Sequence, residues 1–210
     1  MWYKLKRILI YPDGVTEKQV YPKKLYEYSY DFRNKTQAWI QADGWEIKAG
    51  SVSFSSDWMR LMGYPCRIKK SWISDVMRSA NKITQTFSFL CQGYAIMYAI
   101  AQDVTSSSAP NLTWGYLDSR VGTRSLGCGG SSQEASWFSA WTYTSTVIVD
   151  LENKIASLSI PSYADVTKAL TDADVTNIRN NTNCICIFGY QNDSDSSKIL
   201  RISTLSLIIE

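Results

Sequence analysis

The sequence predicts an all-β fold: a jelly-roll β-sandwich with a short helix and an N-terminal β-hairpin arm. Three observations lead to this prediction. About a dozen short segments alternate apolar and polar residues, which is the pattern of strands with one buried face. Aromatic residues, which favour strands, make up 13% of the 210 residues. A single segment has helical spacing, whereas an α/β fold would need a crossover helix after most of its strands.

The first 24 residues predict a basic hairpin. In "MWYKLKRILIYPDGVTEKQVYP" apolar and basic residues alternate up to a Pro-Asp-Gly turn, after which a second strand can run back. Residues 1–24 hold six Lys/Arg and two Asp/Glu, a net charge of +4, while the other 16 basic and 17 acidic residues give −1. Basic residues interrupt the apolar run, so the segment does not fit a secretory signal.

These properties divide the chain into an attachment arm at 1–24 and a sandwich domain at 25–210. A lone two-stranded ribbon is only marginally stable in water, so the arm must pack on its own domain or on a partner. The difference in charge favours a partner. The arm residues expected to make this contact are Trp2, Lys4, Lys6, Arg7 and Lys18.

The strands expected in the sandwich are short and separated by Gly, Ser, Asn and Asp. In chain order they are Tyr26–Phe32, Trp45–Lys48, Val52–Phe54, Trp58–Met62, Thr84–Cys91, Ala95–Gln102, Leu112–Leu117 and Trp137–Tyr143. The segment "TVIVDLENKIASLSI" is the clearest hairpin, because apolar residues alternate on both sides of the "ENK" turn. Two further strands, Cys184–Tyr190 and Lys198–Glu210, follow later in the chain.

The one expected helix lies in "TDADVTNIRN". Thr171 and Asp174 are three residues apart, the spacing of a capping box at a helix start. Val175 and Ile178 then share one apolar face.

Composition excludes several classes of function. The chain has no His, and its five Cys are scattered without a CxxC, so neither a zinc site nor a disulfide framework is expected. The domain at 25–210 has a net charge near zero, so a nucleic-acid-binding surface is not expected there. Residues 83–102 carry no charge, but they alternate with period two and contain Gly93, so we expect two core strands and no membrane insertion.

The best candidate for a catalytic motif in the sequence is the pair Asp150 and Glu152. Glycoside cleavage needs two carboxyl groups about 5–10 Å apart with different pKa values. These two residues flank the start of the "ENK" turn and no third acid follows at the expected spacing, so we interpret them as solvated charges. GxSxG, HExxH and P-loop patterns are absent from the sequence. The prediction is therefore that the protein is not an enzyme.

One loop has the oxygen-rich composition that calcium prefers. In "GYQNDSDSS" the candidate ligands are Asn192, Asp193 and Asp195. The same residues are typical of a polar hairpin turn, and the spacing is not that of an EF-hand, so no cofactor is required.

Aromatic residues cluster in "LTWGYLDSR" and "ASWFSAWTY". Sugars stack their apolar faces on aromatic rings while Asp, Asn or Arg bind the hydroxyl groups. The candidate glycan-binding residues are Trp114, Tyr116, Asp118, Arg120, Trp137, Trp141 and Tyr143. Large aromatic residues on strands also fill sandwich interiors or contact other proteins, and all three interpretations fit these segments.

Two parts of the chain resemble known families. The series "TSTVIVDLENKIASLSI", "TDADVTNIRNNTN", "CICIFGY" and "ILRISTLSLIIE" resembles the last third of concanavalin A-like, or laminin-G-like, sandwich domains. The opening "MWYKLKRILIYPDGVTEKQVYP" resembles the start of virion proteins in tailed phages of gut bacteria, including the crAss-like group. The second resemblance is short, and the first depends on hydrophobic patterns.

The resemblance implies a non-enzymatic structural component of a bacteriophage particle, as a fibre, tail or capsid-decoration protein. The arm would attach it to other virion proteins, and the sandwich would serve display or adhesion to the host surface. A virion location and a homo-oligomer, a trimer in the case of a fibre, follow from the same resemblance. The alternative is a lectin-like module that binds a surface glycan, and a glycan-cleaving enzyme is the third hypothesis.

Overall fold

The computed structural model describes residues 25–71, 74–92, 95–102, 113–120, 123–128, 131–134, 142–162, 164–180, 183–189 and 199–210. The strands are β1 (Tyr26–Asp31), β2 (Glu46–Phe54), β3 (Met59–Ser71), β4 (Lys82–Gln92), β5 (Ala95–Gln102), β6 (Thr113–Arg120), β7 (Thr123–Cys128), β8 (Ser131–Glu134), β9 (Thr142–Asp150), β10 (Ile155–Ile160), β11 (Ala164–Ala169), β12 (Asn183–Gly189) and β13 (Ile199–Ile209). The helices are α1 (Gln37–Ala42), α2 (Ser74–Arg78) and α3 (Asp172–Asn180). The predicted all-β class is confirmed, whereas the predicted arm lies outside the described residues.

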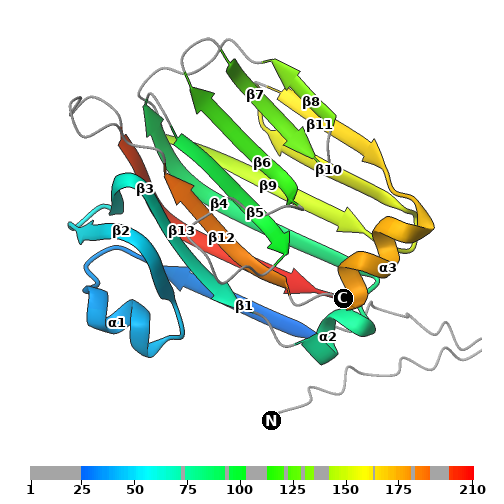
Figure 1. The fold of residues 1–210 in the computed structure, drawn as a ribbon, viewed down its shortest axis with the longest axis horizontal. Coiled ribbons are helices and arrows are strands. Elements are labelled where there is room, and N and C mark those ends of the chain that lie inside the picture. Colours follow the sequence, from blue (N-terminus) through cyan, green and yellow to red (C-terminus); the bar gives the residue numbers. More distant parts are fainter. Residues whose placement is uncertain are drawn as a thin grey trace, which may run out of the picture.

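The described strands form one antiparallel hydrogen-bonded sheet that folds over into two layers (Figure 1). The back layer has the order β1-β13-β4-β9-β10-β11, and the front layer has the order β2-β3-β12-β5-β6-β7-β8. Strands β10 and β11 lie against β6, β7 and β8, which closes the sandwich at that end. This arrangement is a two-layer antiparallel β-sandwich, as the sequence predicts.

Strand β13 joins the two layers. Its first residues pair with β3, where Arg201 lies opposite Arg60. After a bulge between Ile202 and Thr204, the same edge of β13 pairs with β1. The other edge pairs with β4 along the whole strand. Because β13 changes partners, the sheet continues from one layer into the other without a break.

Much of the described core lies on one face of the back layer, and Val52, Met59 and Leu61 of the front layer are also buried. Along β4 the residues Ile83, Phe87 and Phe89 are buried, and they alternate with half-buried Thr86 and Ser88. The same period of two continues in β9, β10 and β13. Burial of these apolar side chains stabilises the sandwich, because each contributes about 1.5–3 kcal/mol on removal from water. The side opposite the core is called the outer face below.

The outer face is rich in hydroxyl groups. Strand register places Ser and Thr side by side across the back layer. One row runs through Ser29, Ser206, Thr86, Thr146 and Ser159. Such a neutral polar face suits the solvent side of an antiparallel sheet, whose residues alternate between core and water.

An aromatic cluster attaches β1 to the β2 end of the sandwich. The ring of Phe32 packs edge-on against Trp45 at 5.3 Å between centroids, and Tyr30 packs edge-on against Phe32 at 4.9 Å. The Trp45 indole Nε1 donates a hydrogen bond of 3.0 Å to the Tyr28 hydroxyl oxygen. Burial and hydrogen bonding to the Asp43 carboxylate raise the pKa of Tyr28, which keeps this hydroxyl a neutral donor.

The predicted hairpin and helix are both present. Val147 lies opposite Leu158 in the β9–β10 pair, and the turn between the strands ends at Lys154, whose φ of 55° is left-handed. At the start of α3 the Thr171 and Asp174 side chains accept each other's backbone N–H groups, at 2.9 and 3.1 Å, as a capping box predicts.

The prediction of a single helix is wrong. Helices α1 and α2 have six and five residues, too few for a helical period to appear in the sequence. Strands β7, β8 and β11 are additional as well, and they have four to six residues each. Their short runs contain Gly, Ser, Thr and charged residues, which resemble loop composition.

Candidate functional site

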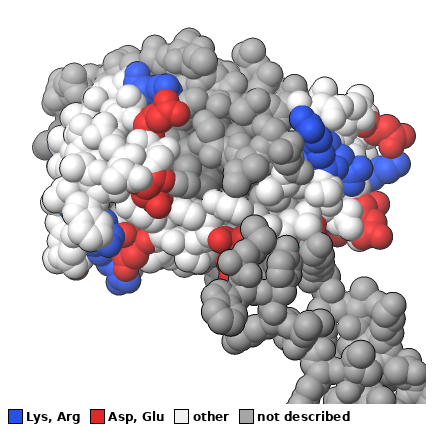
Figure 2. All heavy atoms as spheres, turned by 90° about the horizontal axis from the view of Figure 1, so that it is seen from below, with Lys and Arg blue, Asp and Glu red and all other residues white. Residues whose placement is uncertain are grey.

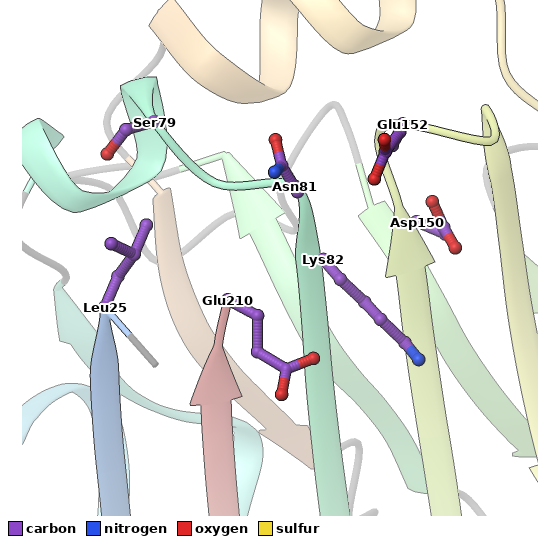
Figure 3. Close-up of a pocket in the computed structure, with 7 residues that line it drawn as sticks. All are labelled: Leu25, Ser79, Asn81, Lys82, Asp150, Glu152 and Glu210. Carbon is purple, nitrogen blue, oxygen red and sulfur yellow. The ribbon is translucent and has the colours of Figure 1, made fainter. Parts of the chain in front are cut away.

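The back layer ends in a pocket where several strands and α2 meet (Figure 3). This strand-end pocket has a volume of about 290 Å³ and is lined by Leu25, Ser79, Asn81, Lys82, Asp150, Glu152 and Glu210. Backbone hydrogen bonds fix the strand ends, because Asn81 and Lys82 both donate to the Glu210 carbonyl oxygen, at 2.6 and 3.1 Å. Two lining residues, Lys82 and Asp150, are the end residues of β4 and β9, and the other five lie in turns or next to strand ends.

Opposite charges alternate along the edge of the pocket. Lys82 lies between Asp150 of β9 and Glu210, which follows β13, and its side chain extends toward β9 (Figure 3). Partial burial acts in the other direction, but hydrogen bonds from Asn153 and the charge of Lys82 lower the pKa of Asp150. Asn153 donates to both oxygens of that carboxylate, at 2.8 and 2.9 Å.

Asp150 therefore holds the β9–β10 turn. Glu152 lies in the turn and not in the strand, so the two carboxylates do not form a pair on one strand face. A carboxyl group with a lowered pKa stays ionised near neutral pH, and so it is a poor general acid. The pocket instead combines carboxylate acceptors, an ammonium group, an amide and one apolar side chain, groups that bind hydroxyl-bearing ligands.

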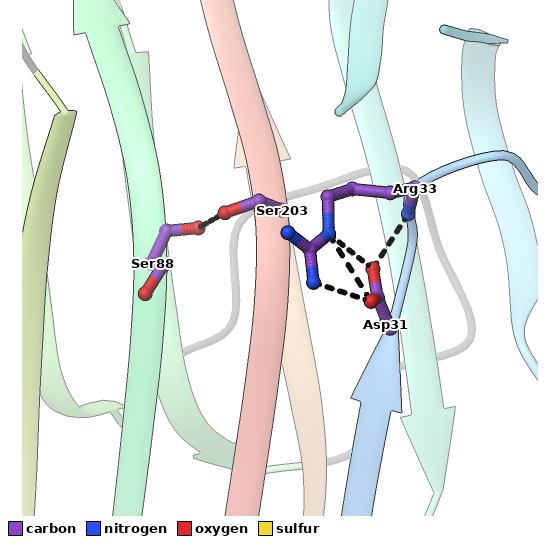
Figure 4. Close-up of polar contacts among 4 residues, drawn as sticks. All are labelled: Asp31, Arg33, Ser88 and Ser203. Atoms are coloured by element: carbon purple, nitrogen blue, oxygen red, sulfur yellow. Dashed lines mark hydrogen bonds and ion pairs between the residues drawn. The ribbon is translucent and has the colours of Figure 1, made fainter. Parts of the chain in front are cut away.

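A second, shallower hollow lies on the outer face. It has a volume of about 320 Å³ and is lined by Ser29, Tyr30, Asp31, Thr86, Thr204, Leu205 and Ser206. The Arg33 guanidinium binds the Asp31 carboxylate, with 2.6 Å between nitrogen and oxygen (Figure 4). The hydrogen bonds from the Arg33 side chain are the main reason why the pKa of Asp31 is lowered. On the adjacent strands the Ser203 hydroxyl donates to the Ser88 carbonyl oxygen at 3.2 Å.

The residues predicted for glycan binding divide between the two layers. Trp114, Tyr116, Asp118 and Arg120 occupy alternate positions of β6 in the front layer. Strand register places Tyr116 opposite Tyr98 of β5, and Asp118 opposite Ser125 of β7. Alternate positions share one face of a strand, so the spacing on which the prediction depends is present. A binding role for these four residues stays a prediction.

Tyr143 corrects the predicted aromatic platform. Its side chain is 4% exposed, on the core side of β9, with its ring 6.0 Å from that of Phe89. A buried ring cannot stack on a sugar from solvent, so Tyr143 is a core residue. Trp137 and Trp141 lie outside the described residues.

Two other predicted sites also lie outside the described residues. They are the calcium candidates Asn192, Asp193 and Asp195, and the arm residues Trp2, Lys4, Lys6, Arg7 and Lys18. Within the described part of the chain, Cys, Asp and Glu form no group of three that could hold a metal ion. No described helix is long and apolar enough to cross a bilayer.

Some candidate residues were not predicted from the sequence. Trp39 on α1 is 63% exposed, with the Lys35 ammonium 4.6 Å from its ring centroid. In the sequence Trp39 is a single aromatic residue in a short segment between two Gln residues. A search for clustered aromatic residues therefore does not find it. Asn81 and Glu210 come from distant segments, and only strand pairing brings them together.

Comparison with known proteins identifies the class of fold. No family model and no curated protein matches the chain. Among solved structures, lectin II from Ulex europaeus superimposes with a TM-score of 0.64 at 11% identity, covering 90% of this chain and 100% of the lectin. Peanut lectin gives 0.66 at 13% identity, covering 88% and 98% of the two chains. The chain therefore has the legume-lectin type of concanavalin A-like sandwich.

A sialidase is also similar, with a TM-score of 0.59 at 9% identity. The match covers 88% of this chain but 18% of the sialidase, so the common fold is a minor part of that protein. Identities this low establish the fold alone.

Proposed function

We propose that the chain is a non-enzymatic glycan-binding module. The observation that supports this most is the superposition on whole lectin chains, since nearly all of this domain matches nearly all of each lectin. Two other similar structures are lectin UEA-II complexed with galactose and a lectin from Bauhinia forficata in complex with GalNAc. Fold alone does not define function, so the proposal also depends on the strand-end pocket.

The strand-end pocket has suitable chemistry for a neutral saccharide. The Asn81 amide and the Lys82 ammonium supply donors, and the carboxylates of Glu152 and Glu210 supply acceptors. Leu25 adds an apolar surface for the C–H face of a sugar ring. Charged partners strengthen such hydrogen bonds, and backbone bonding of the strand ends holds the groups in place.

A glycan array followed by titration with each hit tests the proposal. Asn81→Ala should weaken binding of a hit by about 5- to 10-fold, the value of one lost hydrogen bond. Asn177→Ala, at an exposed Asn of α3 that does not line the pocket, is the matched control and should leave affinity unchanged. An array without hits contradicts the function. Loss of affinity in Tyr116→Ala but not in Asn81→Ala would place the site at β6.

The virion role is a separate proposal, and the resemblance of residues 1–22 to phage virion openings is its support. We propose that these residues attach the sandwich to other virion proteins, and that the protein assembles as a homo-oligomer in the particle. Deletion of residues 1–22 should leave a folded sandwich that no longer joins the particle. Absence of the protein from purified particles, or unfolding of the truncated domain, would contradict this proposal.

A further inference from the structure

Two arginines lie side by side at the end of the outer face far from the strand-end pocket. Arg60 of β3 and Arg201 of β13 are direct cross-strand partners. Their neighbours Met59, Leu61 and Ile202 are buried in the core, so both arginine side chains are on the outer face. Directly opposite positions place like charges about 5 Å apart at Cβ, which destabilises a sheet.

Neither guanidinium is balanced by a carboxylate among the residues that the structure describes. Nε of Arg60 and Nε of Arg201 are buried, and both lack a hydrogen-bond acceptor. Arg33 differs in this respect, because the Asp31 carboxylate binds its guanidinium. Buried donors normally have partners, so two unsatisfied donors on adjacent like charges require an explanation.

Arg201 is held in place by Trp58. Its guanidinium carbon is 3.9 Å from the centroid of the Trp58 ring. The turn before β3 fixes this tryptophan, because the Ser55 hydroxyl accepts the backbone N–H groups of both Asp57 and Trp58, at 3.2 and 3.3 Å. Burial, followed by repulsion from Arg60, lowers the pKa of Arg201. The pair is thus ordered but short of negative charge.

Hydroxyl groups lie next to the arginine pair. Arg201 is opposite Leu90 of β4, and two residues along that strand Ser88 faces Thr204 and Thr144. The Ser88 and Thr144 hydroxyl oxygens are 3.3 Å apart. Figure 2, a view from below, shows described Lys and Arg side chains next to Asp and Glu side chains toward both the left and the right of the view. A cationic pair beside a neutral hydroxyl surface fits a ligand that carries both an acidic group and hydroxyl groups.

We propose that Arg60 and Arg201 bind the oxyanion group of an acidic saccharide, whose hydroxyl groups contact the adjacent Ser and Thr rows. The anion would accept hydrogen bonds from both guanidinium groups and remove their mutual repulsion. The ligand class rests on the proposed glycan-binding function, whereas the site itself is distinct from the strand-end pocket. A planar carboxylate and a tetrahedral sulfate ester both have the required charge.

Two matched pairs of ligands test this proposal. Oligogalacturonate is compared with its methyl ester, and dextran sulfate with dextran, by titration at constant ionic strength. In at least one pair the charged member should bind about 10- to 100-fold more tightly, the factor for one or two charge-assisted hydrogen bonds. Arg60→Gln and Arg201→Gln should each remove most of this preference. Arg201→Lys should remove part of it, because lysine keeps the charge but lacks the guanidinium geometry.

Lys154→Gln is the control for net charge, since it removes one positive charge from the β9–β10 turn, at the other end of the sheet, and should preserve the preference. Urea unfolding measures whether each variant is folded. If loss of the Trp58 contact unfolds Arg201→Gln, the test rests on Arg60→Gln. Equal affinity within both pairs, or a preference that survives both Gln variants, overturns the inference. Binding of inorganic sulfate without any saccharide preference also overturns it. A neutral glycan bound without preference for charge leaves the proposed function intact, whereas an absence of all saccharide binding contradicts both.

Discussion

Gln85 is expected to lower the stability of the sandwich. It lies on the core side of β4, is 0% exposed, and has Leu207 and Val147 as its cross-strand partners. Both atoms of its side-chain amide lack a hydrogen-bond partner. Burial of an unsatisfied amide costs about 1–3 kcal/mol, and methionine has a similar length and no such requirement. Gln85→Met should therefore raise the free energy of unfolding by about 1–3 kcal/mol.

Urea denaturation measures this change. With an m-value of about 2 kcal/mol/M, the midpoint should rise by about 0.5–1.5 M. Gln41→Met, on the exposed side of α1, is the control and should change stability by less than about 0.5 kcal/mol. The diagonal neighbour Ser145 is also buried without a partner. If Gln85→Met destabilises the domain, and Ser145→Ala does so non-additively, a buried water bridges the two side chains and the reasoning is refuted.

Further predictions concern the helix start and the core. Thr171→Ala should lower the free energy of unfolding by about 1 kcal/mol in urea titration, whereas Thr176→Ala within the exposed part of α3 should have little effect. Hydrogen bonds from Thr171 lower the pKa of Asp174. Ionised Asp174 therefore makes its full contribution to the free energy of unfolding above the unfolded-state pKa of about 3.9, and this contribution is lost as the pH falls through the lower folded-state pKa. Stability measured between about pH 5 and pH 2.5 should therefore fall less steeply in Asp174→Asn than in the wild type, and equal slopes would contradict this assignment. Phe87→Ala should destabilise by about 3–5 kcal/mol, and a loss below about 1 kcal/mol would show that the ring is not packed in the core.

The sequence predicts those parts of the fold that depend on local patterns. The alternation in β4 and β9 identifies the buried face of the back layer, and the Thr171–Asp174 spacing locates α3. Helix α1 escapes prediction, because its six residues present a mostly exposed Trp39 and a single buried Ile40. A pattern that short has no measurable period.

The candidate sites could be predicted only in part. The arginine pair requires Arg60 to lie opposite Arg201, which are far apart in the chain, and no local pattern encodes that register. The strand-end pocket depends likewise on the pairing of β13 with β4. The aromatic prediction failed at Tyr143, because strand alternation groups residues on one face but does not say whether that face meets the core or the solvent.

The central position of β13 has a consequence for synthesis of the protein. It is the last described strand to leave the ribosome, yet β1, β3 and β4 all need it as a neighbour. For example, the hydrogen bond between Ser203 and Ser88 joins residues that are 115 positions apart in the chain. At a translation rate of about 5–20 residues per second, β4 waits several seconds with an unpaired edge. We therefore expect the sandwich to be completed only after β13 has been synthesised, and the nascent chain to need protection from edge-to-edge aggregation until β13 inserts.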